Sequence, residues 1–598
     1  MLLLNLIQKT LSDWISFFAD RLLSNVKKTT CSMRLFFNIS LIFLLCSACD
    51  FHQPNQKVLG TTTDHAMVSS AHPLASAIGV SVMQDGGNAI DAAIAVHFAL
   101  AVVYPQAGNI GGGGFAVIRM HDGSSSALDF RETAPSLATK RMYLDENGDL
   151  NNKRWSTHGR MSSGVPGAID GMFSLHKRFG SKSMESLIQP AIDLAKNGYE
   201  LTFLGAKIIN TTQEDFREHN DWPIPYLQKS PWEKGDRILQ PELAETLVRI
   251  RDEGRNGFYQ GKVADQLVAE MQKGKGLISH DDLANYKSVW RTPILGTYRN
   301  HKIISMPPPS SGGIALLQLL QGTEMHPIAD WGHNVSETVH LMSELERRVY
   351  ADRATYVGDP DFVEVPVDQL LDSTYNHQRF ADISMKKATP SSTVSAGTIP
   401  PIESQETTHL SVVDPNGNAV SITTTLNSSF GSKVLVEGAG FFLNNEMDDF
   451  SSKPGVPNMF GLIGAKANQI APEKRMLSSM TPTIVEKKGK LWMVVGTPGG
   501  STIITSVLQT ILNVHEFGMG MQESVNQARF HHQWLPDMIT IEPNQFDENI
   551  ISKLRKIGYA IDEQNSRVIG KVDAILVLKN GQLEAGADPR GDDTAAGF

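Results

Sequence analysis

Two threonines in a predicted β-hairpin carry the strongest chemical signal in the sequence. Two runs of alternating apolar and polar residues, 407–413 and 419–426, flank a Pro-Asn-Gly-Asn turn sequence. A turn centred near the first asparagine places Thr407 opposite Thr425, or opposite Leu426 if the loop is one residue tighter. Threonine hydroxyls can hydrogen-bond across such a pair. β-branched residues also suit strands for packing reasons alone, so a structural and a chemical interpretation stay open.

The chemical interpretation requires a chain break immediately before Thr407. Cleavage after Glu406 would leave a free α-amine beside the Thr407 hydroxyl. An α-amine has an unperturbed pKa of about 7.7–8.0 and can serve as general base for a weakly nucleophilic hydroxyl. Residues 388–406 are rich in Pro, Ser and Thr and poor in large apolar side chains, which predicts an exposed, mobile loop. A cleavable pro-segment and a plain inter-domain linker both fit that composition.

Other catalytic and metal-binding motifs are absent from the sequence. It contains no Gly-X-Ser-X-Gly and no His-Glu-X-X-His. All three cysteines lie in the first 49 residues, which excludes a catalytic cysteine, a disulfide framework and a cysteine-based zinc site from the rest of the chain. The glycine run 111–114 lacks the ending of a P-loop and is interpreted as close backbone packing. The adjacent His531 and His532 should point to opposite faces of a strand, so we interpret them as structural.

The positioning elements are predicted from apolar spacing. A chain of 598 residues, with 41% hydrophobic and 20% charged residues, allows several domains or one large layered unit. The net charge of −10 supplies no basic excess for neutralising phosphates, so we expect no nucleic-acid partner. Helices are predicted over 75–84, 89–103, 184–197, 241–250 and 312–320, and a strand over 115–120.

The first 49 residues are interpreted as a targeting segment. The apolar run 35–45 has the length of a signal-peptide core and is too short for a stable membrane span. Met33 is a candidate start alongside Met1. Small residues before Cys49 resemble a bacterial lipoprotein cleavage box, although a cysteine stands where leucine is usual. We expect export to the periplasm or cell envelope with a lipid anchor on Cys49; an ordinary secretory signal and an uncleaved anchor are the alternatives.

Several spaced motifs resemble the γ-glutamyltranspeptidase family. The segment TTHLSVVD, which begins at Thr407, resembles the start of that family's small subunit. The other matching motifs follow in family order: GNIGGGGF at 108–115, DFRETAP at 129–135, LNNEMDDFSSKPGVPN at 443–458, MLSSMTP at 476–482, GTPGGS at 496–501 and RFHHQWLPD at 529–537. The resemblance covers about residues 57–598, and this number of ordered motifs makes coincidence an inadequate explanation.

The resemblance implies an α+β fold, a four-layer αββα sandwich of the N-terminal nucleophile hydrolase type, built from two subunits cut from one precursor. The implied parts are a signal segment over 1–49, a large subunit over 50–406 and a small subunit over 407–598, the two subunits remaining together as a heterodimer. The implied activity is that of a γ-glutamyltransferase and glutathione hydrolase, which passes the γ-glutamyl group to water or to amino acids and peptides. The reaction would use no metal and no organic cofactor.

Individual roles follow from the resemblance residue by residue. Thr407 matches the nucleophile, and Thr425 matches the residue that orients it. Gly499 and Gly500 match the backbone donors of an oxyanion hole, where a side chain would obstruct the approach. Residues matched to the substrate α-carboxylate are Arg131, Ser478 and Ser479, and those matched to the substrate α-ammonium are Asn427, Glu446 and Asp449. A guanidinium with two hydroxyls suits a carboxylate, and two carboxylates with an amide oxygen suit an ammonium.

Two features distinguish this chain within the family. Residues 454–472 resemble the family's lid loop, with Phe460 where a tyrosine gate is frequent, so the gate would lose a hydroxyl contact. Glu446 stands where some bacterial members resemble glutamine. The main alternative function is a cephalosporin (glutaryl) acylase of the same fold, which would have no ammonium to bind. A processing-dead solute-binding lipoprotein is a second alternative, and it would give one band on a denaturing gel instead of two.

Overall fold

The computed structural model describes residues 59–151, 154–395, 408–453, 466–564 and 568–598. The predictions for the segment 1–49 with Cys49, for the cleavage site at Glu406 and Thr407, and for the gate residue Phe460 lie outside the described residues. Within the described ranges, no helix combines the length and the apolar character that crossing a bilayer requires.

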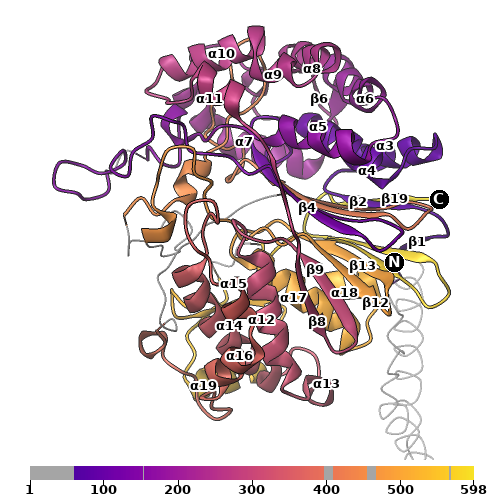
Figure 1. Ribbon diagram of the computed structural model, residues 1–598, viewed down its shortest axis with the longest axis vertical. Helices are drawn as coiled ribbons and strands as arrows, with labels where there is room; N and C mark the ends of the chain where they lie inside the picture. The colour runs from indigo at the N-terminus through magenta and orange to yellow at the C-terminus, as the bar shows by residue number, and fades with distance from the viewer. Residues whose placement is uncertain (1–58, 152–153, 396–407, 454–465, 565–567) are drawn as a thin grey trace, which may run out of the picture. The chain divides into compact units, whose positions relative to one another are not determined.

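Two antiparallel sheets, each of seven strands within the described residues, form the centre of the fold (Figure 1). In spatial order the first sheet contains β1 (Thr61–Thr63), β18 (Leu583–Ala587), β17 (Asp573–Val577), β13 (Lys490–Gly496), β12 (Thr483–Lys487), β9 (His301–Ser305) and β8 (Ile294–Tyr298). The second contains β19 (Thr594–Gly597), β2 (Met67–Ser70), β10 (Thr408–Val413), β11 (Ala419–Thr425), β3 (Gly113–Arg119), β4 (Ser125–Asp129) and β7 (Val289–Arg291).

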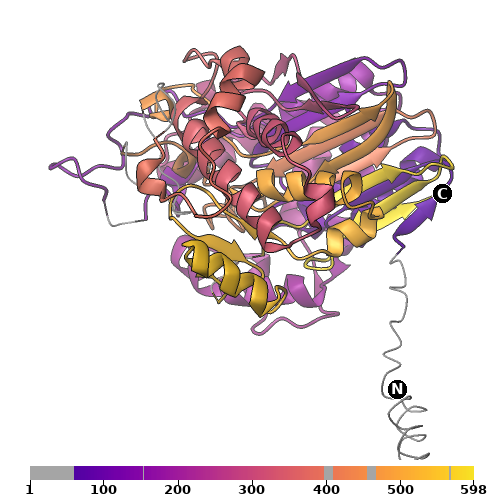
Figure 2. The ribbon, with the colours of Figure 1, turned by 90° about the horizontal axis from the view of Figure 1, so that it is seen from below.

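Helices cover the outer face of each sheet, as Figures 1 and 2 show. The second sheet is covered by α3 (Pro73–Gln84), α4 (Ala89–Val103) and α5 (Ala168–Phe179). The first sheet is covered by α12 (Gly312–Glu324), α17 (Thr502–His515) and α18 (Met521–Asn526). Since β10 and β11 also contact β13 and β17 of the facing sheet, the order of layers is αββα, and the predicted fold is confirmed.

The remaining helices extend the two outer layers. Beside α3 to α5 lie α6 (Met184–Asn197), α7 (Phe203–His219), α8 (Pro241–Glu253), α9 (Asn256–Tyr259), α10 (Gly261–Gln272) and α11 (His280–Asn285). Beside α12 lie α13 (Ile328–Trp331), α14 (Ser336–Tyr356), α15 (Val367–Leu371), α16 (Ser373–Phe380) and α19 (Glu548–Ile557). Short strands pair outside the two sheets: β5 (Tyr199–Glu200) with β6 (Arg237–Ile238), and β15 (Ile539–Ile541) with β14 (Phe530–His531) and β16 (Ile561–Asp562).

Local signals explain where these elements begin. Helix α4 starts at a capping box, in which the Asn88 side chain accepts from Asp91 N at 3.0 Å and Asn88 N donates to the Asp91 carboxylate at 3.0 Å. The helices predicted over 89–103 and 184–197 have those bounds in the structure. The other predicted helices are longer by two to four residues, and the strand predicted over 115–120 is β3.

The alternating pattern of β10 and β11 reflects two buried faces. Leu410 and Val412 pack in the hydrophobic cluster that contains α4. The polar side chains face the other sheet, where His409 Nδ1 hydrogen-bonds Thr423 Oγ1 at 2.9 Å and Ser411 Oγ donates to the Asp573 carbonyl at 3.0 Å. Burial lowers the pKa of His409 to about 3, so its imidazole is neutral and serves as a structural hydrogen-bonding group.

Both sheets combine strands from before and after position 407. Strands β2, β3, β4 and β7 pair in one sheet with β10, β11 and β19, and strands β1, β8 and β9 share the other with β12, β13, β17 and β18. The regions before and after position 407 therefore build one common core. A cut between 406 and 407 would therefore divide the chain without dividing the core. The cut itself stays a prediction.

The segment 388–395 is packed, contrary to the prediction of an exposed loop beginning there. Ser391 and Val394 are buried. Ser391 N donates to the Asp537 carboxylate at 2.7 Å, and the guanidinium of Arg347 contacts both Asp537 and the Ser391 hydroxyl. The composition argument was wrong for Ser391 and Val394 because charged side chains from elsewhere in the chain hold a segment that has few apolar groups of its own.

Candidate active site

The β10–β11 hairpin leads to the candidate site. Its strands pair from Thr408 opposite Thr424 to Val413 opposite Ala419. In the turn, the Asp414 carboxylate accepts from the backbone amides at positions 416 and 418, at 2.9 and 3.0 Å. This is the register required by the first sequence alternative, with 407 opposite 425. The pairing at position 407 itself lies outside the described residues.

Thr425 lies at the end of β11 in a chain of hydrogen bonds. Its buried hydroxyl accepts from Asn427 N at 2.7 Å and lies near the carboxylate of Glu446, where it partly offsets the rise in pKa that burial causes. Asn427 has a left-handed φ of 73°, and its Nδ2 donates to the Asn445 carbonyl at 3.0 Å. Its buried Oδ1 accepts no hydrogen bond from any described residue. A buried amide oxygen without a donor is suited to accept one from a ligand.

The glycine run packs its backbone against β11, which confirms the structural interpretation of 111–114. A Cβ at Gly112 would lie 1.9 Å from the Thr425 carbonyl oxygen. Asn109 locks this contact, because its Nδ2 donates to that carbonyl at 2.8 Å and its Oδ1 accepts from Gly112 N at 2.9 Å. Sequence reasoning assigned no role to Asn109, although it lies within the motif GNIGGGGF that drew attention to this segment.

A buried arginine joins the carboxylates predicted to bind substrate. Arg131, two residues beyond β4, places Nη1 2.8 Å from Glu446 Oε2 and pairs through Nη2 with Asp449. The Leu477 carbonyl accepts from Nη2 at 3.1 Å, and the Tyr286 hydroxyl donates to the Arg131 carbonyl at 2.8 Å. Arg131 is therefore held at the side chain and at the backbone, and two of the three predicted ammonium ligands, Glu446 and Asp449, contact it.

The site contains more carboxyl groups than cationic groups. A third buried carboxylate, Glu132, lies 3.5 Å from Arg131 Nη1. Burial raises the pKa values of Glu132, Glu446 and Asp449, and repulsion from Glu446 raises those of the other two further. One guanidinium thus faces three carboxyl groups, an environment that favours an additional cation. Sequence reasoning passed over Glu132, although the motif DFRETAP contains it.

The two serines predicted to contact the substrate carboxylate lie beside the arginine. They directly follow Leu477, whose carbonyl contacts Arg131. The Ser478 carbonyl accepts from Ser311 N at 2.8 Å, and the Ser479 hydroxyl accepts from Arg353 Nη2 at 2.6 Å. Arg353 comes from the last turn of helix α14, and nothing in the local sequence distinguished it, so sequence reasoning missed it.

The predicted oxyanion-hole glycines form the turn between β13 and α17. Gly499 and Gly500 have φ values of 135° and 66°, a region that residues with a Cβ rarely adopt. A Cβ at Gly499 would also lie 2.5 Å from Thr502 Oγ1 and 3.0 Å from Gly570 Cα. The turn places backbone N–H groups at the amino end of α17, where the helix dipole favours negative charge.

A cavity of about 190 Å³ connects the hairpin end to the glycine turn. Its lining includes two predicted residues, Asn427 and Gly499. Further lining residues are Tyr104, Gln106, Ala107, Ile208, Ser428, Ser429, Pro498, Val568, Gly570 and Lys571. The structure thus brings the Arg131 cluster near Thr425, and the cavity connects Asn427 with Gly499.

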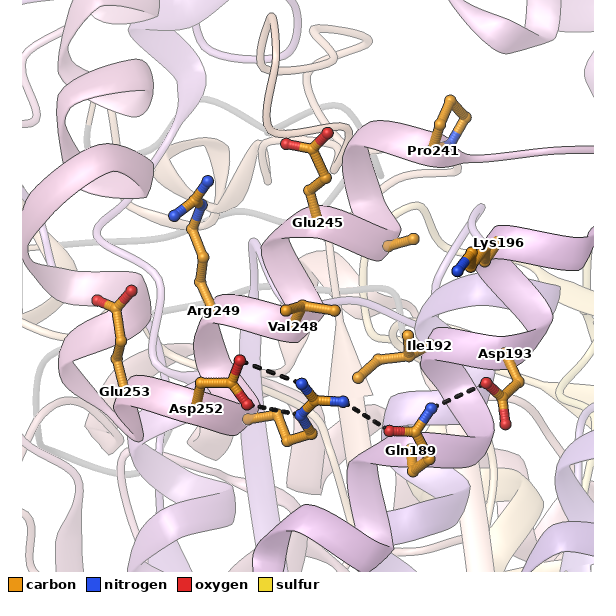
Figure 3. A pocket seen from close by; sticks show the side chains of 12 residues that line it. Gln189, Ile192, Asp193, Lys196, Pro241, Glu245, Val248, Arg249, Asp252 and Glu253 are labelled. Carbon is orange, nitrogen blue, oxygen red and sulfur yellow. Dashed lines mark hydrogen bonds and ion pairs between the residues drawn. The ribbon is translucent and has the colours of Figure 1, made fainter.

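A larger surface pocket lies between α6 and α8 and contains none of the predicted residues (Figure 3). It has a volume of about 630 Å³. In it Arg251 pairs with its neighbour Asp252 and donates to Gln189 at 2.7 Å.

Within the described ranges, no cluster of histidine, cysteine and carboxylate side chains has the arrangement of a metal site. His531 and His532 make structural contacts, with Thr505 Oγ1 at 3.0 Å and near Asp537 at 3.4 Å.

Comparison with known proteins identifies the family. The family model described as gamma-glutamyltranspeptidase matches residues 75–598. The chain belongs to the γ-glutamyltranspeptidase family. This member is 44% identical over 535 residues to the glutathione hydrolase proenzyme of Escherichia coli K12, covering 89% of this chain and 92% of that relative. It is 47% identical over 501 residues to the glutathione hydrolase proenzyme of Pseudomonas sp. A14, covering 83% of this chain and 86% of that relative.

Solved structures support the same assignment for this family member. The crystal structure of Helicobacter pylori gamma-glutamyltranspeptidase is 43% identical, has a TM-score of 0.53, and covers 58% of this chain and 97% of its own. A cephalosporin acylase from Bacillus halodurans shares the fold more extensively, with a TM-score of 0.79. The match covers 92% of this chain and 98% of the acylase, but the two are only 25% identical. Fold alone therefore does not separate the two activities, and the site residues must do so.

Proposed function

We propose that this family member is a glutathione hydrolase and γ-glutamyltransferase that matures by cutting its own chain before Thr407. The observation that carries the proposal is the buried cluster of Arg131 with Glu446 and Asp449, which lies near Thr425 at the end of the hairpin. The relatives named glutathione hydrolase proenzymes support both the activity and the processing.

The charge of the cluster favours a zwitterionic substrate group. The α-carboxylate of a γ-glutamyl compound would bind the guanidinium of Arg131. Its α-ammonium would bind the carboxylates of Glu446 and Asp449 and the free Oδ1 of Asn427. Each charge that leaves an internal pair is then met by one from the substrate, so no buried charge stays unpaired. A glutaryl group brings a carboxylate alone and would add a fourth carboxyl group with no cation to balance it. This difference favours γ-glutamyl substrates over the glutaryl acylase alternative.

Maturation and turnover would use the same hydroxyl. In maturation, Thr407 Oγ attacks the Glu406 carbonyl, the peptide nitrogen leaves as the new Thr407 amine, and water opens the resulting ester. The two products, from about Cys49 to Glu406 and from Thr407 to Phe598, stay together because each sheet contains strands from both. No additional protease is required, and the same step creates the base needed for turnover.

Turnover would proceed through a covalent ester. The Thr407 amine takes the hydroxyl proton, Oγ attacks the γ-glutamyl amide carbon, and the N–H groups of Gly499 and Gly500 stabilise the oxyanion. Thr425 orients the nucleophile. Collapse expels the amine, which leaves with the proton, and a γ-glutamyl ester remains on Thr407. Water then releases glutamate, or an amino acid or peptide amine accepts the γ-glutamyl group, so kinetics with an acceptor are ping-pong.

Trapping the ester tests the proposed function directly. The purified protein is treated with a slowly deacylating γ-glutamyl analogue, and the label is located by peptide mass mapping. We expect one γ-glutamyl group on Thr407, and turnover of a γ-glutamyl anilide well above that of the matching glutaryl anilide. A label on another residue would refute the mechanism, and faster turnover of the glutaryl anilide would favour the acylase.

We also propose that the protein is exported to the cell envelope and anchored by lipid on Cys49. Small residues before this cysteine and the preceding apolar run 35–45 support the proposal. Cys49→Ser should release the protein from the membrane fraction or stall its processing, whereas the matched control Cys46→Ser should not. Fractionation and N-terminal mass measurement check this. A fully soluble wild type with an unmodified N-terminus beyond Cys49 would leave ordinary secretion as the explanation.

A further inference from the structure

We propose that Gln533 is a positioning residue for the reaction: its side-chain amide holds Ser501 and thereby fixes the turn whose N–H groups stabilise the oxyanion. The inference rests on the proposed function, which places the reacting carbonyl at the turn of Gly499 and Gly500. It gives a role to part of the motif at 529–537, to which the family resemblance assigned no function.

Ser501 immediately precedes helix α17, where a serine usually accepts a hydrogen bond from an amide of the first turn. In the described part of the chain its buried hydroxyl makes no such bond, and it donates instead to Gln533 Oε1 at 2.6 Å. The Ser501 carbonyl accepts from the Tyr350 hydroxyl. The side chain and the backbone of Ser501 are therefore both held by groups outside the turn.

The turn depends on such contacts because it consists of two glycines. Without a Cβ the backbone of glycine has a wide choice of conformations, so neighbouring groups must select the φ values of 135° for Gly499 and 66° for Gly500. Within the turn, the Gly499 carbonyl accepts from Thr502 Oγ1 at 2.7 Å. Gly500 is bonded directly to Ser501, so movement of Ser501 would rotate the peptide groups that carry the donors. Donors stabilise an oxyanion best when they are fixed before the reaction, and a loosened Ser501 should therefore slow the chemical steps.

The surroundings of the Gln533 amide fix its orientation. Its Nε2 donates to the Leu535 carbonyl at 3.1 Å, so its Oε1 faces Ser501 and also His531 Nε2, which lies 3.0 Å away. Burial lowers the pKa of His531 to about 3, so the neutral ring carries one proton, and this proton must be on Nε2. His531 Nδ1 then accepts from the Thr505 hydroxyl, 3.0 Å away on helix α17. A reversed amide would place two oxygens together at Leu535, so Gln533 presents an acceptor to Ser501.

The segment that carries Gln533 is anchored to the rest of the chain by Trp534. This residue has a left-handed φ of 67°, and its backbone N donates to His532 Nδ1 at 3.1 Å. Its indole Nε1 donates to the carbonyls of Ser391 and Val394, at 3.2 and 3.0 Å. Gln533 therefore reaches the turn from a fixed backbone, as a positioning residue must.

Gln533→Met tests the role directly. Methionine has a similar length but no amide, so Ser501 loses its acceptor. We expect kcat for a γ-glutamyl anilide to fall by roughly 10- to 30-fold, less than the roughly 10²–10³ that loss of a whole donor costs. KM should change by less than about twofold, because the Arg131 cluster is untouched. Steady-state kinetics measure both constants, with active sites counted by the covalent label on Thr407.

Gln509→Met is the matched control. Gln509 joins the same helix to the same segment, because its Nε2 donates to the Phe530 carbonyl at 2.7 Å and its Oε1 accepts from Phe530 N at 3.3 Å. It does so in the middle of α17, away from the glycine turn. We expect Gln509→Met to lower stability in a thermal melt but to keep the wild-type kcat. A role of Gln533 in packing alone would give the two variants the same result.

Ser501→Ala removes the other partner of the same hydrogen bond. It should lower kcat as much as Gln533→Met does, and the double variant should be lower than either by less than about twofold, because the two substitutions remove one interaction. Ser524→Ala is the control for this change. The buried Ser524 hydroxyl donates to the Thr510 carbonyl at 3.2 Å, on a part of α17 away from the turn, so kcat should be unchanged.

Three results would overturn the role of Gln533 and leave the proposed function intact: an unchanged kcat in Gln533→Met, an equal loss in Gln509→Met, or losses that multiply in the double variant. If Gln533→Met does not mature, Ser501→Ala compared with Ser524→Ala decides. A wild type that neither turns over the anilide nor forms the Thr407 ester would refute the proposed function, and this inference with it.

Discussion

Thr407→Ala is expected to leave the chain uncut and to lower turnover of γ-glutamyl substrates by on the order of 10⁴-fold or more. The substitution removes the hydroxyl proposed to attack the Glu406 carbonyl and, after maturation, the substrate amide. Intact-mass measurement should find one polypeptide where the wild type gives two. Because strands from before and after position 407 pair within both sheets, the uncut protein should still fold cooperatively in a thermal melt.

The neighbouring threonine provides the matched control. Thr408 is buried in β10, and its hydroxyl has no hydrogen-bond partner among the described residues. Thr408→Ala should therefore mature and turn over substrate, although a small loss of stability from lost packing is expected. A Thr407→Ala protein that still divides between 406 and 407 would contradict self-cleavage by this hydroxyl.

Arg131→Lys is expected to raise KM for γ-glutamyl substrates by roughly 10²-fold, with a smaller effect on kcat. The guanidinium reaches Glu446 and Asp449 at the same time, and a single ammonium cannot reproduce that fork. Losing one charge-assisted contact in a buried site typically costs about 1.5–3 kcal/mol, which corresponds to the expected change in affinity. Steady-state kinetics with a γ-glutamyl anilide measure it.

Self-cleavage separates a binding defect from misfolding in this variant. Maturation involves no substrate carboxylate, so Arg131→Lys should impair cleavage much less than it raises KM. Arg237→Lys, at an arginine whose side chain is 53% exposed, serves as the control and should change neither quantity. An unchanged KM in Arg131→Lys would show that the substrate carboxylate binds elsewhere.

Local patterns in the sequence were sufficient for several elements. The hairpin of β10 and β11, the helices over 89–103 and 184–197, and the close packing of glycines 111–114 were all predicted and are present. These elements depend on turn residues, capping groups and the spacing of apolar residues. Each of these signals involves residues close together in the sequence, so the sequence alone predicts the elements. The four-layer arrangement was different, since it followed from motif resemblance and not from periodicity.

Only the tertiary structure decided which distant residues complete the site. Asn109, Glu132 and Arg353 reach it from a loop, the segment after β4 and the last turn of a helix, and no local pattern marks their partners. The same is true of Gln533, whose hydrogen bond with Ser501 joins residues 32 positions apart. Segment 388–395 was mispredicted for this reason. The sequence by itself determined the elements and the types of chemistry, whereas the contacts that set charge, orientation and specificity depend on side chains brought together by folding.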